Sequence, residues 1–183
     1  KHTKMKKIFL IALTTTFLSC TKEEIIEKEV IIPVNNNVEL YNHQLLENSY
    51  VLAIENGGFN AFLMNKQGFK VKDWVFSERM GNDIEILPNG KILGTFKSAS
   101  NVINIGGASG IIKILNPNGT TSWSYLCCDA NKVAHHDVEM LPNGNVLFLV
   151  WEKITPTEAL NYGIETSYTL YPEALYEVST TTN

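Results

Sequence analysis

From residue 38 onward, apolar and polar residues alternate in short runs with a period of two, and this pattern predicts β-strands. The clearest case is 134–150, which we interpret as a β-hairpin with strands at 137–141 and 146–150. Its turn is Pro142-Asn143-Gly144, in which proline presets one φ angle and asparagine and glycine tolerate the left-handed one. Because 146–150 is nearly all apolar, we expect that strand to be buried on both faces.

The same hairpin occurs 54 residues earlier, at 83–96, where 7 of 14 positions are identical. Two carboxylates recur with the hairpin, since Asp83 and Glu85 correspond to Asp137 and Glu139. We interpret the two aspartates as structural, because a carboxylate at the entrance of a strand accepts backbone N–H groups. We interpret the two glutamates as a solvated or edge-satisfying pair, and catalysis is the alternative for them. The alternative for Asp137 is a supporting role in which it fixes the tautomer of a neighbouring histidine.

A longer period surrounds the hairpins. Gly68 and Gly119 each end a turn, Trp74 and Trp123 follow on the next strand, and a hairpin comes after each. Four short strands recurring about every 50 residues are typical of a β-propeller blade. We therefore expect an all-β fold, a β-propeller with about two to three four-stranded antiparallel blades in this chain. A strand-rich sandwich with a coincidental repeat is the alternative.

The sequence predicts almost no helix, and the only candidate is one short turn at 157–162.

The strand at 174–178 is followed by a polar, turn-like segment at 179–183. We expect the folded part, 38–183, to be a partial propeller truncated at its C-terminus. A single blade does not bury both its faces, so this chain is not expected to be a stable closed monomer.

Composition limits the classes of function. Hydrophobic residues make up 44% of the chain and charged residues 19%, which is typical of a folded domain. The formal net charge is −4, and it becomes −8 when residues 1–19 are left out, because they hold four lysines and no acid. An acidic surface repels phosphate backbones, so we expect no nucleic-acid partner.

Residues 1–20 predict a lipoprotein signal peptide. Lys6-Lys7 is basic, and the apolar run 8–18 is too short to span a bilayer. The end of the run, Phe17-Leu18-Ser19-Cys20, resembles a lipobox, in which the cysteine is lipidated; an ordinary secretory signal is the alternative. Residues 21–37 read as a flexible tether. We expect an envelope protein of a Gram-negative bacterium, periplasmic or at the cell surface, attached to the membrane only through its lipid.

The later hairpin differs from the earlier one by a histidine pair, since His135 and His136 stand where the earlier copy has Gly81 and Asn82. Alternation along a strand points one imidazole toward a propeller axis and the other into the blade, without deciding which. An imidazole serves as nucleophile, general acid or base, or hydrogen-bond donor. The alternative is a buried histidine bonded to a backbone carbonyl.

Other chemistry has less support in the sequence. Adjacent histidines point oppositely, so we expect no metal site at the pair. Cys127 and Cys128 are neighbours, and a disulfide between neighbours is strained, so burial or a partner elsewhere is expected.

A family resemblance rests on two motifs, which read His135-His136-Asp137-x-Glu139-x-Leu141-Pro142-Asn143-Gly144 and Asn116-Pro117-Asn118-Gly119-x-x-x-Trp123. Over about residues 45–183 the chain resembles the bacterial arylsulfotransferase (aryl-sulfate sulfotransferase) family, including its Bacteroidetes-type lipoproteins. The resemblance implies a six-bladed propeller that moves a sulfuryl group from a phenolic sulfate to a phenol. The reaction runs through a covalent histidine intermediate and uses no cofactor.

The resemblance implies that His135 or His136 orients or polarises the sulfate. The attacking histidine of the family lies in a later blade and has no match here, so we expect this chain to be inactive alone. The alternative function is a non-catalytic propeller that binds an anionic ligand, a glycan or a protein partner at the cell surface. Homo-oligomers are compatible with either function.

Overall fold

The computed structural model describes residues 34–42 and 44–181. The predicted signal peptide with Cys20, and residues 21–33 of the predicted tether, lie outside these described residues. At the other end of the predicted tether, the backbone N–H of Asn35 donates to the carbonyl of Gln67 at 2.7 Å, so this segment contacts the folded part. In the described part of the chain, no helix is long and apolar enough to cross a membrane.

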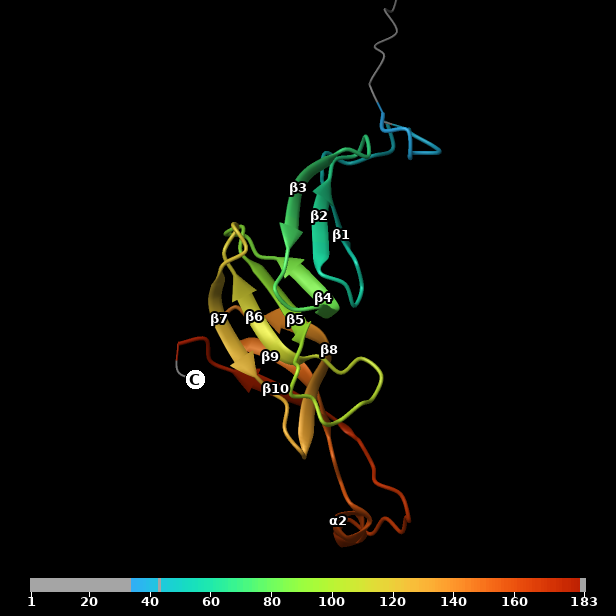
Figure 1. Ribbon diagram of the computed structural model, residues 1–183, viewed down its shortest axis with the longest axis vertical. Helices are drawn as coiled ribbons and strands as arrows, with labels where there is room; N and C mark the ends of the chain where they lie inside the picture. Colours follow the sequence, from blue (N-terminus) through green and yellow to red (C-terminus); the bar gives the residue numbers. More distant parts are fainter. Residues whose placement is uncertain (1–33, 43, 182–183) are drawn as a thin grey trace, which may run out of the picture. The chain divides into compact units, whose positions relative to one another are not determined.

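Three antiparallel sheets make up the fold, which is all-β as the sequence predicts (Figure 1). Sheet A contains β1 (Val51–Ile54), β2 (Asn60–Met64) and β3 (Lys70–Val75). Sheet B contains β4 (Met80–Ile86), β5 (Ile92–Lys97), β6 (Gly110–Leu115) and β7 (Thr121–Leu126). Sheet C contains β8 (Lys132–Met140), β9 (Val146–Glu152) and β10 (Glu173–Val178).

The strand count corrects one expectation. Only sheet B has four strands, whereas sheets A and C each have three among the described residues. The sheets also divide the repeat differently from the sequence analysis, which places each hairpin at the end of a repeat. In the structure each repeated hairpin, β4–β5 or β8–β9, begins a sheet. The physical reason is hydrogen-bond pairing: the strand that carries Trp123 pairs with β6 and closes sheet B, and β8 then starts a new sheet.

The two repeated hairpins share their local details. Each turn has its glycine at positive φ, 77° at Gly90 and 84° at Gly144, as the sequence predicts. The ladder of each hairpin also shifts register in its first strand, between Met80 and Ile84 in β4 and between His135 and Val138 in β8. These shifts are typical of β-bulges, which redirect side chains at the edge of a sheet.

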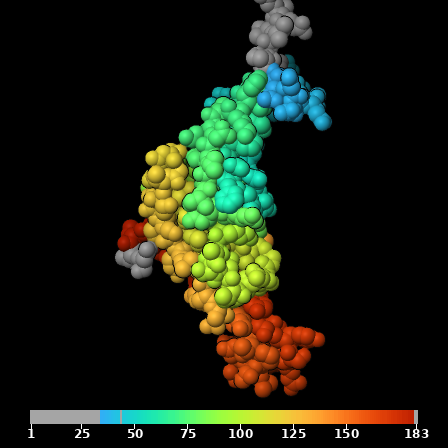
Figure 2. Space-filling model, in the orientation of Figure 1, coloured from blue at the N-terminus to red at the C-terminus, as the bar shows by residue number. Residues whose placement is uncertain are grey.

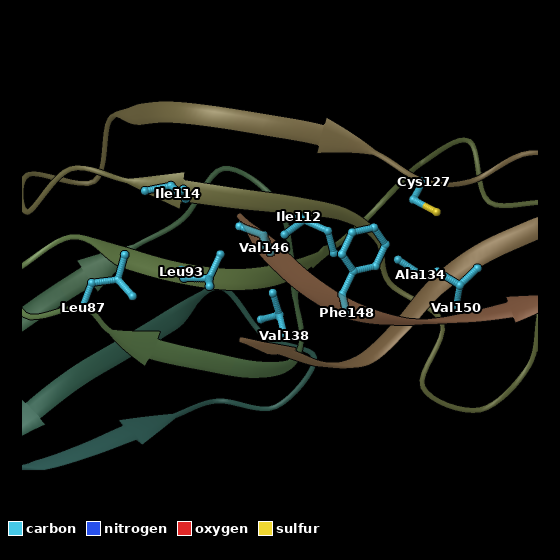
Figure 3. Packing of buried hydrophobic residues seen from close by; sticks show 10 residues of the cluster. All are labelled: Leu87, Leu93, Ile112, Ile114, Cys127, Ala134, Val138, Val146, Phe148 and Val150. Atoms are coloured by element: carbon cyan, nitrogen blue, oxygen red, sulfur yellow. The ribbon is translucent and has the colours of Figure 1, made fainter. Parts of the chain in front are cut away.

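Sheets B and C pack face to face over one hydrophobic core (Figure 3). Leu93, Ile112 and Ile114 come from sheet B, and Val138, Val146, Phe148 and Val150 come from sheet C. A second core joins sheets A and B and includes Trp74, whose indole N–H donates to the carbonyl of Pro117 at 3.1 Å. Trp74 is therefore a core residue, as the sequence predicts.

The expectation that residues 146–150 are buried on both faces is wrong. Val146, Phe148 and Val150 are buried against sheet B, but Leu147 and Leu149 between them are only half-buried. Among the described residues, nothing covers the second face of sheet C as sheet B covers the first.

The connection between β9 and β10 contains the only helix of the described residues, α2 (Pro156–Asn161), in the orange-red segment of Figure 2. The sequence predicts a short turn at this position, and a capping box explains it. The Thr155 hydroxyl accepts the Glu158 N–H at 3.3 Å, and the Glu158 carboxylate accepts the Thr155 N–H at 2.7 Å.

Candidate functional site

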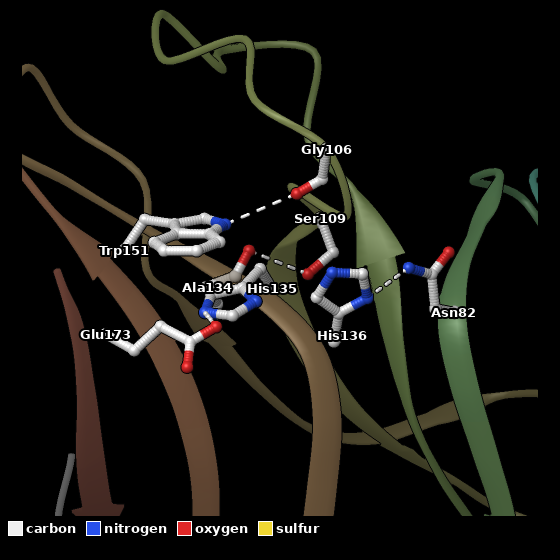
Figure 4. Close-up of polar contacts among 8 residues, drawn as sticks. All are labelled: Asn82, Gly106, Ser109, Ala134, His135, His136, Trp151 and Glu173. Atoms are coloured by element: carbon white, nitrogen blue, oxygen red, sulfur yellow. Dashed lines mark hydrogen bonds and ion pairs between the residues drawn. The ribbon is translucent and has the colours of Figure 1, made fainter. Parts of the chain in front are cut away.

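The histidine pair lies in the bulge of β8, and its two side chains have opposite environments (Figure 4). His135 is 0% exposed, and its ring stacks on Trp151 with 4.3 Å between ring centroids. A loop closes over it, since Ala108 pairs with His135 and the Trp151 indole N–H donates to the carbonyl of Gly106 at 3.3 Å. His136 is exposed.

His135 is a buried imidazole without a hydrogen bond. Neither of its ring nitrogens has a hydrogen-bond partner among the residues that the structure describes, backbone carbonyls included. The nearest charge belongs to Glu173, whose Oε1 lies 3.8 Å from Nε2. Burial lowers the pKa of His135, a charge on His136 lowers it further, and Glu173 partly opposes both. The ring is therefore neutral near pH 7 and does not reach a ligand in this arrangement.

His136 is held in an unusual backbone conformation. Its φ is 49°, in the left-handed region where residues other than glycine are uncommon and histidine is one of the enriched types. Its Nδ1 lies 2.6 Å from Nδ2 of Asn82, and its ring lies against Gly107, where an added β-carbon would overlap the ring. With Nδ2 of Asn82 as the donor, Nδ1 is the acceptor, the ring proton is on Nε2, and only Nε2 remains for a ligand.

An open hollow of about 370 Å³ lies beside this histidine. It is lined by Asn82, Asp83, His136, Asp137 and Leu149. Burial raises the pKa of the Asp83 carboxyl, the N–H of Val138 opposes this rise, and the neighbouring Asp137 adds to it. The hollow thus offers one imidazole, one amide and two carboxylates to a polar ligand.

The repeated carboxylates connect neighbouring sheets. Asp83 Oδ2 accepts the backbone N–H of Val138 at 3.2 Å, and Glu85 Oε1 accepts that of Met140 at 3.3 Å. The structural interpretation of Asp83 is therefore confirmed, and Glu85 satisfies a backbone N–H at the edge of the neighbouring strand. Asp137 accepts the N–H of its neighbour Val138 at 3.2 Å, and the ring of His136 takes its hydrogen bond from Asn82 instead.

Asn82 is the site residue that the sequence reasoning missed. It is the counterpart of His136 in the earlier hairpin, and the packing of β4 against β8 brings the two side chains together. The signal was present in the repeat, because equivalent positions on neighbouring first strands lie at the same height. The sequence comparison contrasts the two residues and does not predict their contact.

The remaining candidate groups do not add a second centre. Cys127 and Cys128 are free thiols, and burial raises the pKa of Cys127 to about 11. No group of three or more histidine, cysteine or acidic side chains in the described ranges is placed to hold a metal ion.

No protein-family model, curated protein or solved structure matches this chain.

Proposed function

We propose that this chain is part of a β-propeller of the aryl-sulfate sulfotransferase type, in which His136 orients the sulfate group of an aryl sulfate. The propeller part is supported by the way sheets B and C pack face to face, with β4 and β8 side by side at one edge. Antiparallel sheets repeated around an axis have this relation between neighbours. We further propose that Cys20 carries a lipid that holds the protein at the cell envelope.

The observation that carries the proposal is the fixed, exposed imidazole of His136. Because Asn82 engages Nδ1, the ring cannot rotate freely, and Nε2 is the group available beside the open hollow. An oriented Nε2–H donor stabilises charge on a sulfate oxygen without reorganising during the reaction. This role is that of an orienting donor and not of a nucleophile.

The proposed reaction needs a second imidazole as nucleophile. Its nitrogen attacks sulfur while the bond from sulfur to the donor oxygen breaks, and the donor leaves as a phenolate. An acceptor phenol then attacks the same sulfur, loses its proton to a base, and frees the nitrogen. His135 is fully buried and stacked on Trp151, so it does not supply this nucleophile in the arrangement described.

Charge gives the reason why we expect no turnover by this chain alone. Asp83 and Asp137 line the hollow and oppose an anion, and sulfuryl transfer needs positive groups around the transferring oxygens. Two nearby basic side chains are engaged elsewhere, since Lys97 of β5 donates to the carbonyl of Ala108, and Arg79, just before β4, lies over the ring of Phe59. The same carboxylates favour the second candidate function, a propeller that binds a polar ligand without catalysis.

The test is a titration of the 183-residue chain with 4-nitrophenyl sulfate, followed by NMR of the histidine ring protons and backbone amides and by release of 4-nitrophenolate. We expect the His136 ring signals and the backbone amides of Asn82 and Gly107 beside it to shift in the wild type. These amides should not shift in His136→Asn, which carries the residue of the earlier hairpin, and they should respond unchanged in His135→Phe. Binding without release agrees with the proposal. Equal titrations of wild type and His136→Asn would sink it, and release by this chain would show that its nucleophile lies within these residues.

A further inference from the structure

Four asparagines of this chain are followed by glycine, and all four pairs lie in turns of the structure. They are Asn56-Gly57, Asn89-Gly90, Asn118-Gly119 and Asn143-Gly144. In such a pair the backbone nitrogen of the glycine can attack the side-chain amide carbon of the asparagine, because glycine has no β-carbon to hinder the approach. The four pairs therefore share one possible reaction, and the hydrogen bonds of each turn decide whether it occurs.

The three pairs that follow proline have their glycine nitrogen held by the turn. The N–H donates to the backbone carbonyl three residues earlier, which belongs to Leu87 for Gly90, to Asn116 for Gly119 and to Leu141 for Gly144, at 2.8, 2.8 and 2.9 Å. An N–H that donates to a carbonyl loses its proton less readily, because the hydrogen bond is lost with the proton. This bond must break before the nitrogen can attack.

The asparagine side chains of these three turns are held as well. Each Oδ1 accepts the backbone N–H two residues later, at 3.0 Å from Lys91 to Asn89, 3.1 Å from Thr120 to Asn118 and 2.9 Å from Asn145 to Asn143. These bonds restrict the side-chain torsions that have to change for ring closure. In the three proline turns, the attacking nitrogen and the amide that it would attack are therefore both engaged.

The turn between β1 and β2 lacks both restraints. It closes one residue later relative to its asparagine, since the N–H of Gly58 donates to the carbonyl of Glu55 at 2.8 Å. The N–H of Gly57 and the side chain of Asn56 have no hydrogen-bond partner among the residues that the structure describes. Asn56 is exposed, and a β-carbon added to Gly57 would meet no atom within 4 Å. The nitrogen and the amide of this pair are therefore free to meet.

We propose that Asn56 is a site of spontaneous modification, at which this chain converts an asparagine into aspartate and isoaspartate. The Gly57 nitrogen gives its proton to solvent and bonds to Cγ of Asn56, while Nδ2 takes up a proton and leaves as ammonia. The product is a five-membered succinimide. One water then opens this ring: at the side-chain carbonyl it yields aspartate, and at the main-chain carbonyl it yields isoaspartate. Water is the only co-reactant, and the site is independent of the proposed function.

The new carboxylate follows Glu55 directly in the chain. Nδ2 of Asn60 donates to Glu55 Oε2 across the hairpin at 2.6 Å, and the Glu55 side chain lies against Gly58. A negative charge at residue 56 repels this carboxylate, and isoaspartate also adds one atom to the backbone of the turn. Leu52 and Ile54 of β1 pack on the core that joins sheets A and B. We therefore expect the modification to destabilise the β1–β2 hairpin and to loosen that packing.

The first experiment compares the four asparagines within one sample. The 183-residue chain is kept at neutral pH in water enriched in heavy oxygen, and its peptides are followed by mass spectrometry. Ring opening inserts one oxygen from the solvent, so products formed during the incubation are distinguished from older ones. We expect Asn56 to react at least about tenfold faster than Asn89, Asn118 or Asn143, because each of these must first give up a hydrogen bond.

Unfolding the chain in urea provides the matched control. All four asparagines precede glycine, so their rates should become similar once the folded turns are lost. Asn56→Gln should remove the reaction at residue 56, because glutamine would have to close a six-membered ring, and it should leave the other three rates unchanged. Asn56→Asp reproduces the charge of one product and should speed amide exchange in β1 and β2, whereas Asn56→Gln should not.

Three results would overturn the proposal. One is a folded chain in which an asparagine of the three proline turns reacts as fast as Asn56. Another is a lead of Asn56 that persists in urea, because the folded turn then does not select the site. The third is an Asn56 that stays unchanged in the folded chain while it reacts in urea.

Discussion

Replacing Glu85 with alanine removes the acceptor through which sheet B holds the first strand of sheet C. The N–H of Met140 points away from β9, because the neighbouring pair Leu141 and Asn145 carries the hydrogen bond of the hairpin. Without Glu85 this N–H loses its partner at 3.3 Å. Leaving a buried or half-buried N–H unpaired costs about 1–3 kcal/mol. We therefore expect the free energy of unfolding to fall by that amount in Glu85→Ala.

The matched control is Glu85→Gln, in which the side-chain oxygen still accepts the Met140 N–H. Burial raises the pKa of Glu85 above its ordinary 4.5, the charge of Glu139 raises it further, and the hydrogen bond from Met140 opposes the rise. Since the charged form is disfavoured in the folded chain, Gln at this position should match or slightly exceed wild type at pH 7.

The same shift fixes the sign of the pH dependence at Glu85. The pKa of Glu85 is higher in the folded than in the unfolded chain, so the folded chain keeps this proton to a higher pH. Above pH 4.5 the folded chain therefore binds more protons than the unfolded chain. This carboxyl therefore contributes a loss of stability as pH increases from 4.5 to its folded pKa, and Glu85→Gln removes that contribution. The difference between wild type and Glu85→Gln should grow over this interval and then level off.

Urea unfolding followed by circular dichroism measures these differences, and thermal melts check them at about 2–4 °C for each kcal/mol. Hydrogen exchange of the Met140 amide reports the bond itself. If Glu85→Ala is as stable as wild type, or if Glu85→Gln loses as much as Glu85→Ala, the carboxylate does not hold the neighbouring sheet and the reasoning fails.

Three further predictions follow from single contacts. The pKa of His135 is lowered in the folded chain, so the unfolded chain binds the proton first and stability is lost as pH falls below 6.5. His135→Phe keeps a ring stacked on Trp151 and removes this titration, so its melting temperature should change less than that of the wild type between pH 7 and pH 5. Gly107→Ala should lower the free energy of unfolding by about 1–2 kcal/mol, because alanine is strained at the φ of 77° that Gly107 adopts. It should also move the NMR signals of the His136 ring, because the added β-carbon overlaps that ring. Thr155→Ala should cost about 1 kcal/mol and speed amide exchange only around α2.

The local parts of the fold could be predicted from the sequence because they depend on local chemistry. The Pro-Asn-Gly turns need glycine at positive φ, and both Gly90 and Gly144 adopt it. The sequence predicts that the repeated aspartate accepts a backbone N–H group, and Asp83 does so; Glu85 accepts another. A short turn is expected at 157–162, and in the described part of the chain α2 lies there, with Thr155 as its cap.

Sheet boundaries could not be predicted, because a repeat has a period but no marked beginning. The 54-residue spacing fits a unit that starts with the hairpin as well as one that ends with it. Only the pairing of β7 with β6, and the lack of pairing between β7 and β8, fixes where one sheet stops. The burial of His135 is also a long-range effect, since it depends on Trp151 and on the loop around Gly106.

The one wrong expectation about burial carries more information than the correct ones. A strand as apolar as 146–150 is normally covered on both faces, and the structure covers one. Leu147 and Leu149 are only half-buried, whereas the equivalent positions of sheet B, Leu93 and Thr95, are fully buried. The apolar pattern of β9 therefore predicts that the strand lies against a core, but it does not tell how many of its faces are covered.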